Sequence, residues 1–261
     1  MPALVALTGA SGFIGRAILQ KLVKRGYNVR ALVRKPQPDT ESVQWIQGDL
    51  SNTAALHELA KDAFAVIHCA GQVRGNSLET FVQTNVEGTK NLVRAAIDQT
   101  VKPRFLLISS LAARQPELSW YAKSKQMAEQ SLAEYSGNMQ WTAFRPTAVY
   151  GPGDKEIKPI FNATRYGFLP VVGKSTNYFS LLHVDYFVAA IQCWLRGIRA
   201  GTCCPASGRC SPPRSWQCGC QRWKYVPSAR NAYARTCSPT PPAGRRTAGS
   251  WRWRYQRHPS S

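Results

Sequence analysis

The sequence predicts an α/β protein with a Rossmann-type, doubly wound parallel sheet and an incomplete small substrate lobe. Three observations lead to this prediction. Short apolar runs alternate with helical patterns, glycines stand where the first run turns into the first helix, and the alternation stops near residue 199. Strands that alternate with amphipathic helices are typical of a parallel sheet, because two parallel neighbouring strands must be joined by a long crossover connection, usually a helix.

The first strand-to-helix corner predicts a dinucleotide site. Residues 3–7 are an apolar run that indicates a buried strand, and apolar residues at spacings of three and four from Ile14 indicate a helix. Glycines between them permit a tight turn and let a phosphate approach the first N–H groups of the helix. An ordinary glycine-rich turn is the alternative, but the flanking strand and helix favour a nucleotide. The corner contributes the predicted cofactor residues Gly9, Ser11, Gly12, Phe13, Ile14 and Gly15.

The end of the second strand, residues 29–33, bears on the choice of cofactor. A site for NAD usually carries Asp or Glu there, because a carboxylate accepts hydrogen bonds from the ribose hydroxyls. This chain has Arg34 and Lys35 instead. Two cations suit a 2′-phosphate, which Arg can hold through paired charged hydrogen bonds, whereas a solvated basic pair is the alternative. The position favours NADP, with NAD as the second choice.

The next two strands, residues 43–46 and 65–68, also end in residues suited to a cofactor. Asp49 is expected to bond the adenine amine, or else to act as a turn residue or helix cap. Small residues after the later strand let the backbone lie against the ribose. His68 is expected to pack at the strand end, because no other His or Cys stands at ligand spacing, and no metal is predicted. The two segments add Asp49, Leu50, Cys69, Ala70 and Gly71 to the cofactor residues.

Candidates for the chemistry come later in the chain. A fifth strand, residues 104–108, ends at Ser109 and Ser110, where open α/β sheets bind ligands. A helix that opens at residue 120 places Tyr121 and Lys125 on one face, because they are four residues apart. A nearby ammonium favours the phenolate, so we expect the pKa of Tyr121 to lie below its usual value of about 10. Tyr121 could then exchange a proton with a substrate oxygen.

Eight short motifs, taken in order, resemble the extended, epimerase/dehydratase-like branch of the short-chain dehydrogenase/reductase superfamily. They are TGASGFIG, GDL, CAG, TNVEGT, ISS, YAKSK, RPTAVYGPGD and LLHVD, between residue 3 and about residue 197. The resemblance implies an NAD(P)-binding Rossmann domain in residues 1–154. It also implies a partial substrate lobe, with its return to the core, in residues 155–199.

The resemblance implies roles for individual residues as well. Ser110 would hydrogen-bond the substrate oxygen, Tyr121 would act as acid and base, and Lys125 would activate Tyr121 and bond the nicotinamide ribose. Asn85, an unusual residue inside a helical pattern, matches a position that supports the active-site backbone, although an exposed helix face would also tolerate it. The segment expected along the nicotinamide includes Pro146 and Val149.

Three functions are open at this point. The leading one is an NADP-preferring oxidoreductase that moves a hydride between nicotinamide and a carbonyl or alcohol carbon. The second is an epimerase or dehydratase with retained cofactor, although Ser110 and Tyr121 are closer in sequence than in many sugar-nucleotide epimerases. The third is an NAD(P)-binding protein without turnover. The resemblance further implies a homodimer, because helices around residues 80–98 and 120–135 pair subunits in many relatives.

Residues 200–261 have a different composition. They hold 11 Lys and Arg residues, no Asp or Glu, six of the eight cysteines, and no Leu, Ile, Phe or Met. Such a segment cannot bury enough aliphatic surface to offset chain entropy, so we expect disorder. The cysteines lack paired zinc spacing, and a disulfide framework conflicts with a cytoplasmic core. A frameshift in GC-rich DNA is the preferred explanation, and binding of single-stranded nucleic acid through Arg and Trp is the alternative.

The net charge of +20 reflects this tail, because residues 1–199 carry 23 basic and 14 acidic side chains, a net of +9. We therefore expect no nucleic-acid partner. No apolar run reaches the length of about 20 residues that crosses a bilayer, and the first strand begins without a signal peptide. A cytoplasmic protein that acts on small molecules is the expectation.

Overall fold

The computed structural model describes residues 3–167 and 180–197. The predicted Rossmann-type sheet is confirmed: six strands lie in the order β3-β2-β1-β4-β5-β6, and each neighbouring pair runs parallel. They are β1 (Leu4–Thr8), β2 (Asn28–Val33), β3 (Val43–Gln47), β4 (Ala65–His68), β5 (Arg104–Ile108) and β6 (Trp141–Phe144). The order changes direction between β1 and β4, which is the point where such sheets bind ligands beyond the carboxyl ends of their strands.

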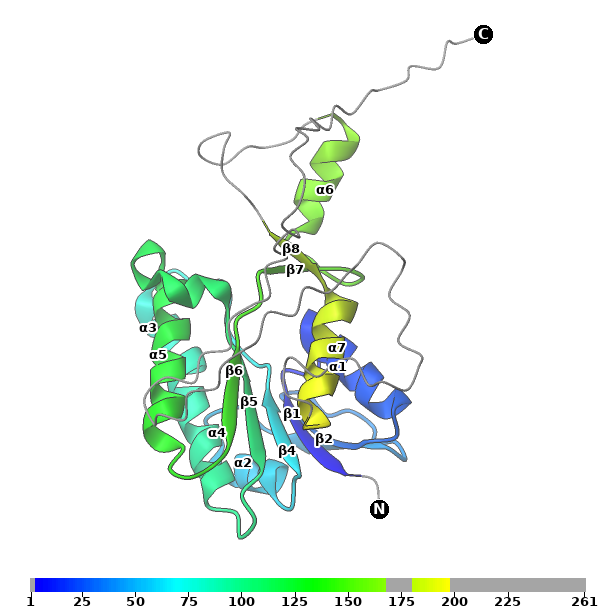
Figure 1. Ribbon diagram of the computed structural model, residues 1–261, viewed down its shortest axis with the longest axis vertical. Coiled ribbons are helices and arrows are strands. Elements are labelled where there is room, and N and C mark those ends of the chain that lie inside the picture. Colours follow the sequence, from blue (N-terminus) through cyan, green and yellow to red (C-terminus); the bar gives the residue numbers. More distant parts are fainter. Residues whose placement is uncertain (1–2, 168–179, 198–261) are drawn as a thin grey trace, which may run out of the picture.

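Helices cover both faces of the sheet, as Figure 1 shows. On one face lie α1 (Phe13–Lys24) and α7 (Val184–Leu195), and on the other lie α2 (Thr53–Ala60), α4 (Gly88–Ile97) and α5 (Trp120–Tyr135). The side chains of a strand point alternately to opposite faces, so each strand contributes to both cores. In β1, Val5 and Leu7 pack with α1 and α7, whereas Ala6 packs with α2, α4 and α5.

The helix expected around residues 80–98 is not continuous. α3 (Leu78–Phe81) leads into a π-helical segment, η1 (Val82–Glu87), before α4 begins. Single π-helical turns inside helices often mark functional segments. Asn85 lies in η1 and is 2% exposed, so its amide is buried in the core and does not lie on a solvated helix face.

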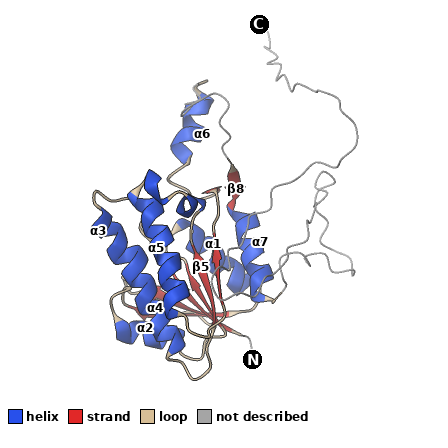
Figure 2. Cartoon of the chain, turned by 60° about the vertical axis from the view of Figure 1, so that its left-hand side comes forward, coloured by secondary structure: helices blue, strands red, loops and turns tan. Residues whose placement is uncertain are grey.

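Short elements complete the described part of the chain. Two 3₁₀ turns, η2 (Leu111–Arg114) and η3 (Pro116–Leu118), connect β5 to α5. A small parallel pair, β7 (Ala148–Tyr150) and β8 (Leu181–His183), lies beyond the carboxyl end of the large sheet, and α6 (Lys158–Arg165) lies farther out (Figures 1 and 2). The tail predicted for residues 200–261 lies outside the described residues, as does part of the predicted lobe.

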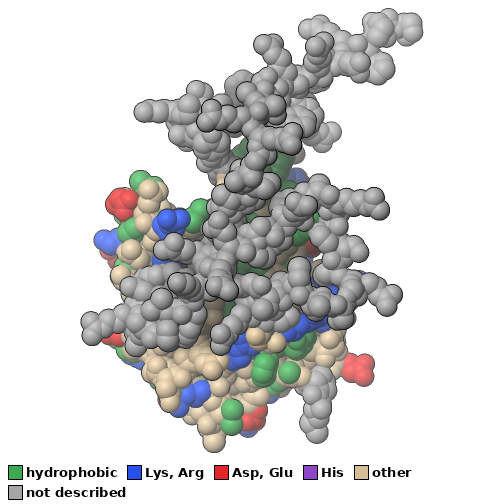
Figure 3. All heavy atoms as spheres, in the orientation of Figure 1, with side chains coloured by type: hydrophobic (Ala, Val, Ile, Leu, Met, Phe, Trp, Pro, Cys, Tyr) green, Lys and Arg blue, Asp and Glu red, His purple; other side chains and the backbone are tan. Residues whose placement is uncertain are grey.

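The described surface carries charges of both signs. Figure 3 shows Lys and Arg side chains together with Asp and Glu side chains on one face of the molecule. Arg74 forms an exposed ion pair with Glu156, and Lys90 forms a partly buried one with Glu87. Across residues 3–167 and 180–197, we find no helix whose length and apolarity would let it cross a membrane.

Candidate active site

The turn between β1 and α1 forms a cradle of bare backbone. Gly9 has a φ of +74°, and a Cβ atom there would lie 2.6 Å from the backbone nitrogen of Ala70, so a side chain does not fit. A Cβ atom at Gly15 would lie 2.0 Å from the Gly9 carbonyl oxygen, which shows how closely α1 approaches the strand end. The N-terminal end of a helix attracts anions. The cradle therefore fits the phosphates of a dinucleotide.

Other predicted cofactor residues gather around this turn. Partly buried side chains that pack against the core shared by β1, α1 and α7 include Phe13, Ile14, Cys69 and Val149. The Gly12 N–H donates to the Gly9 carbonyl at 3.0 Å, which closes the turn in which Ser11 lies exposed. The Pro146 carbonyl accepts a hydrogen bond from the Leu111 N–H at 2.9 Å. The segment expected along the nicotinamide is therefore tied to the chain just after Ser110.

Arg34 lies at the other end of the predicted cofactor site. It lines a pocket of about 390 Å³ together with Gln47, Gly48, Asp49 and Asn52. Asp49 Oδ1 accepts hydrogen bonds from the Ser51 N–H at 2.8 Å and the Ser51 hydroxyl at 2.6 Å, and these bonds lower the pKa of Asp49. Asp49 is thus a turn residue that still faces the pocket. Leu50 packs on α4, since a Cβ atom at Gly88 would lie 2.6 Å from Leu50 Cδ1.

The three predicted catalytic side chains lie at one corner of the fold, beyond the end of β5. The Ser110 hydroxyl accepts a hydrogen bond from the Ala112 N–H at 3.2 Å and is also hydrogen-bonded to the side chain of Tyr121. Lys125 Nζ donates to the Ile108 carbonyl at 3.2 Å and lies 6.0 Å from the centre of the Tyr121 ring. A substrate oxygen beside Tyr121 would therefore have a second hydroxyl group within reach.

The expectation that the pKa of Tyr121 lies below its usual value was wrong for this arrangement. Burial raises the pKa of Tyr121, because the phenolate loses its hydration, and the hydrogen bond with Ser110 opposes this rise only in part. Burial also lowers the pKa of Lys125, whose ammonium is bonded to the Ile108 carbonyl. The side chain of Tyr121 is consequently a neutral phenol at pH 7. Nearby, burial raises the pKa of the Cys69 thiol to about 12, which keeps that side chain neutral.

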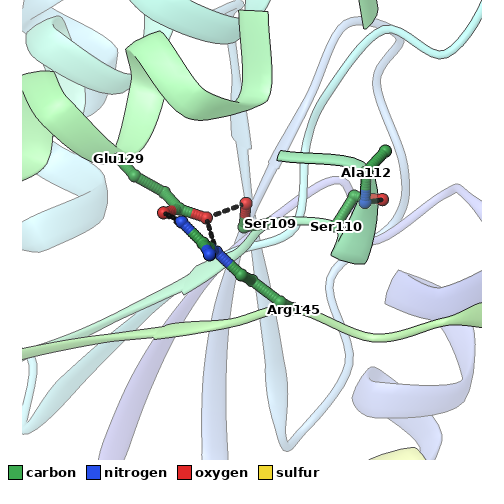
Figure 4. Close-up of polar contacts among 5 residues, drawn as sticks. All are labelled: Ser109, Ser110, Ala112, Glu129 and Arg145. Carbon is green, nitrogen blue, oxygen red and sulfur yellow. Dashed lines mark hydrogen bonds and ion pairs between the residues drawn. The ribbon is translucent and has the colours of Figure 1, made fainter. Parts of the chain in front are cut away.

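A buried carboxylate that the sequence did not bring to notice completes this corner (Figure 4). Glu129 is 4% exposed and follows Tyr121 and Lys125 at the same spacing of four along α5. It accepts hydrogen bonds from the Ser109 hydroxyl and from Arg145 Nε, the latter at 2.8 Å. The ends of β5 and β6 are thereby tied to α5. The repeated spacing was a signal in the sequence, but a Glu on a helix is usually solvated.

A second pocket, of about 360 Å³, opens beside Tyr121. Its lining consists of Val73, Arg74, Gly75, Phe81, Ser119, Trp120 and Tyr121. The Phe81 ring packs edge-on against the Tyr121 ring with the centres 6.3 Å apart, and Trp120 is 50% exposed. Arg74 pairs with Glu156 at 3.0 Å. The pocket thus offers aromatic and aliphatic surface, with one cation, next to the predicted proton donor.

Among residues 3–167 and 180–197, no group of three or more His, Cys, Asp and Glu side chains could hold a metal ion. His68 is 1% exposed and is hydrogen-bonded to Thr8 and Thr89, which agrees with the packing role expected for it at the end of β4.

A family model and known enzymes are similar to most of this chain. The model of the NAD dependent epimerase/dehydratase family matches residues 5–203, which ends close to the change in composition. Ceramide reductase of Caulobacter vibrioides is 38% identical over 197 residues, which cover 74% of this chain and 61% of that enzyme. For 2-alkyl-3-oxoalkanoate reductase of Stenotrophomonas maltophilia the identity is 28% over 222 residues, with coverage of 77% and 67%.

Solved structures are similar at a comparable level. MoeE5 in complex with UDP-glucose and NAD has a TM-score of 0.61 and 28% sequence identity, and the match covers 73% of this chain and 70% of that one. This chain spans 61% of the length of the ceramide reductase that it matches.

Proposed function

This chain belongs to the NAD-dependent epimerase/dehydratase family, and we propose that it is an NADP-preferring oxidoreductase that reduces a carbonyl group. The observation that carries the proposal is the meeting of Ser110, Tyr121 and Lys125 beside the glycine cradle. A protein that only binds the cofactor has no need of all three side chains. The two reductases named above are similar to 74% and 77% of this chain, and the reaction in their names supports the choice of a reductase.

The roles of the three side chains follow from their contacts. A bound nicotinamide would supply the hydride for the carbonyl carbon. Tyr121 would give its phenolic proton to the carbonyl oxygen while the Ser110 hydroxyl holds that oxygen in place. The raised pKa of Tyr121 suits this acid role, because the phenol stays protonated at neutral pH. The ammonium of Lys125 would stabilise the phenolate that proton transfer leaves behind.

The proposed preference for NADP rests on the exposed Arg34. Its guanidinium lines the pocket at the end of β2, where an acidic residue would otherwise accept bonds from the ribose hydroxyls. A charge-assisted contact between guanidinium and phosphate is worth about 1.5–3 kcal/mol.

For the substrate we propose a carbonyl compound that carries an apolar chain. The pocket beside Tyr121 supports this class, because Val73, Phe81 and Trp120 offer apolar surface within reach of the phenol. The names of the two relatives, a ceramide reductase and a 2-alkyl-3-oxoalkanoate reductase, point to chain-bearing substrates as well. A sugar-nucleotide epimerase with retained cofactor is the second candidate, which the likeness to MoeE5 with its bound UDP-glucose and NAD favours.

Two measurements on the 261-residue chain test these assignments. The first is fluorescence titration with NADPH and NADH. The second is turnover on 3-oxoacyl compounds of increasing chain length, with UDP-glucose as the competing substrate. We expect oxidation of NADPH that becomes more efficient as the chain lengthens. Conversion of UDP-glucose without net cofactor consumption would favour the epimerase instead, and binding without turnover on any compound would identify a protein that only binds the cofactor.

A further inference from the structure

A second set of buried polar side chains lies between the glycine cradle and α5. Thr8, His68, Asn85, Thr89 and Ser124, here called the inner network, are each 2% exposed or less. Buried polar groups destabilise a core unless they are hydrogen-bonded. The hydrogen-bond partners of these five side chains therefore show which segments of the chain the inner network connects.

The hydrogen bonds around His68 determine its tautomer. The Thr89 hydroxyl donates its proton to the Asn85 carbonyl at 2.6 Å, so Thr89 Oγ1 must accept from His68 Nε2–H at 3.1 Å. A neutral imidazole then has Nδ1 as its acceptor, and the Thr8 hydroxyl donates to it at 2.7 Å. Thr8 Oγ1 in turn accepts from the Ala70 N–H at 3.1 Å. Burial keeps the ring neutral by lowering the pKa of His68 to about 3.

Asn85 extends the network to two further segments. Its Oδ1 accepts a hydrogen bond from the Gln72 N–H at 2.7 Å, and its Nδ2 donates to the Gln72 carbonyl at 3.0 Å and to Ser124 Oγ at 2.9 Å. Ser124 Oγ donates to the Tyr121 carbonyl at 2.8 Å. Two sets of hydrogen bonds, one at the backbone carbonyl of Asn85 and one at its side-chain amide, thus join the backbone of Ala70 to the backbone of Tyr121.

The loop of residues 70–72 leaves little free space around it. A Cβ atom at Gly71 would lie 3.0 Å from Lys125 Nζ and 3.1 Å from Asn85 Oδ1, and a Cβ atom at Gly9 would lie 2.6 Å from Ala70 N. Because the loop touches the cradle on one side and the Lys125 ammonium on the other, a small displacement of it alters both.

We propose that His68 and Thr89 are positioning residues, which hold the loop of residues 70–72 at a fixed distance from Tyr121 and Lys125 and so align the cofactor cradle with the catalytic helix. Neither residue acts on the substrate directly, since both act through Asn85 and the Ala70 backbone. The catalytic part of this proposal rests on the proposed function, whereas its effect on cofactor binding does not. The competing explanation is that the inner network only stabilises the core.

Paired substitutions at Thr89 distinguish the two explanations. Thr89→Val keeps the shape of the side chain and removes the hydroxyl, and Thr89→Ser keeps the hydroxyl. Thr142→Val is the matched control, because it removes a bond of similar length, from Trp194 Nε1 at 3.1 Å, between β6 and α7. The measurements on the full 261-residue chain are NADPH affinity by fluorescence titration, kcat and KM for a 3-oxoacyl substrate, and unfolding in urea.

If the residues position the site, Thr89→Val weakens NADPH binding about 3- to 10-fold. It also lowers kcat about 10- to 100-fold, because small misplacements of reacting groups are costly, while KM for the carbonyl substrate changes little. Thr89→Ser keeps NADPH affinity and kcat close to those of the wild type. Thr142→Val leaves both of these quantities unchanged although it lowers the free energy of unfolding. If Thr89→Val does not fold, the pair Thr8→Val and Thr8→Ser gives the same comparison at the other end of the network.

Two results would overturn the inference: unchanged NADPH affinity in a folded Thr89→Val, or equal impairment of the Val and Ser variants. A wild-type protein that binds NADPH but reduces no carbonyl compound would remove the proposed function instead. In that event the affinity comparison between the Val and Ser variants still decides the inference.

Discussion

The two ends of the predicted cofactor site hold their charges differently. At the Tyr121 end, Lys125 and Glu129 are 6% and 4% exposed and are hydrogen-bonded within the core. At the other end, Arg34 and Asp49 are exposed and line an open pocket. Charges in the interior interact more strongly than charges in water. Changes at the buried end should therefore alter rate and stability, whereas changes at the exposed end should alter affinity alone.

Tyr121→Phe is expected to have the largest effect, because it removes the predicted proton donor. We expect kcat for carbonyl reduction to fall about 10²- to 10⁴-fold. NADPH affinity, measured by fluorescence titration, should stay close to that of the wild type. Tyr27→Phe removes another partly buried phenol, one that packs against the core of α1 and α7, and serves as the control. Wild-type kcat in Tyr121→Phe would disprove the assignment.

Glu129→Gln tests the stability of the buried end. Removing one charge of a buried ion pair costs about 3–5 kcal/mol, and here the largely buried Arg145 guanidinium loses the charge of its carboxylate. Glu156→Gln is the matched change at an exposed pair, with Arg74, and should cost at most about 1 kcal/mol. Urea unfolding of both variants measures the difference. Equal losses would show that burial does not set the energy of these pairs.

Acid should also destabilise the buried end through His68. The pKa of His68 is about 3 in the folded protein, against 6.5 as its ordinary value. As pH falls the unfolded chain therefore binds the proton first, so stability that is present above pH 6.5 is lost towards pH 3. The expected loss is about 1.4 kcal/mol per pH unit within this window. His68→Gln cannot bind that proton, so urea unfolding as a function of pH should show a smaller slope than in the wild type.

Arg34→Asp should have the smallest effect on the stability of the fold, although it should change the preference between the two cofactors. We expect the ratio of NADPH to NADH affinity to fall about 10- to 100-fold, because a contact with the 2′-phosphate is lost and a ribose acceptor is gained. The free energy of unfolding should hardly change. Lys102→Asp alters the charge equally at an exposed residue before β5, at the opposite end of the parallel strands, and should leave the ratio unchanged. Calorimetric titration with both cofactors measures the ratio, and tighter NADH binding by the wild type would contradict the prediction.

Much of the fold and part of the site could be read from local patterns. The strands predicted over residues 3–7, 29–33, 43–46, 65–68 and 104–108 lie within a residue of the observed bounds, because apolar runs and helical spacing are properties of neighbouring residues. Tyr121 and Lys125 share a helix for the same reason. The break at η1 was not predicted, since a π-helical turn has no strong local signal, although the unusual Asn85 stands within it.

By itself, the sequence determined the alternation of strands and helices typical of a doubly wound α/β fold, the glycine corner and the residues that resemble a catalytic set, because each is encoded by spacing within a short segment. The tertiary structure alone decided the pairing of Glu129 with Arg145 and the tautomer of His68, since their partners are distant in the chain. It also decided the direction of the Tyr121 pKa shift. Burial removes the hydration of a phenolate, and the extent of burial depends on packing between elements that the spacing of residues does not specify.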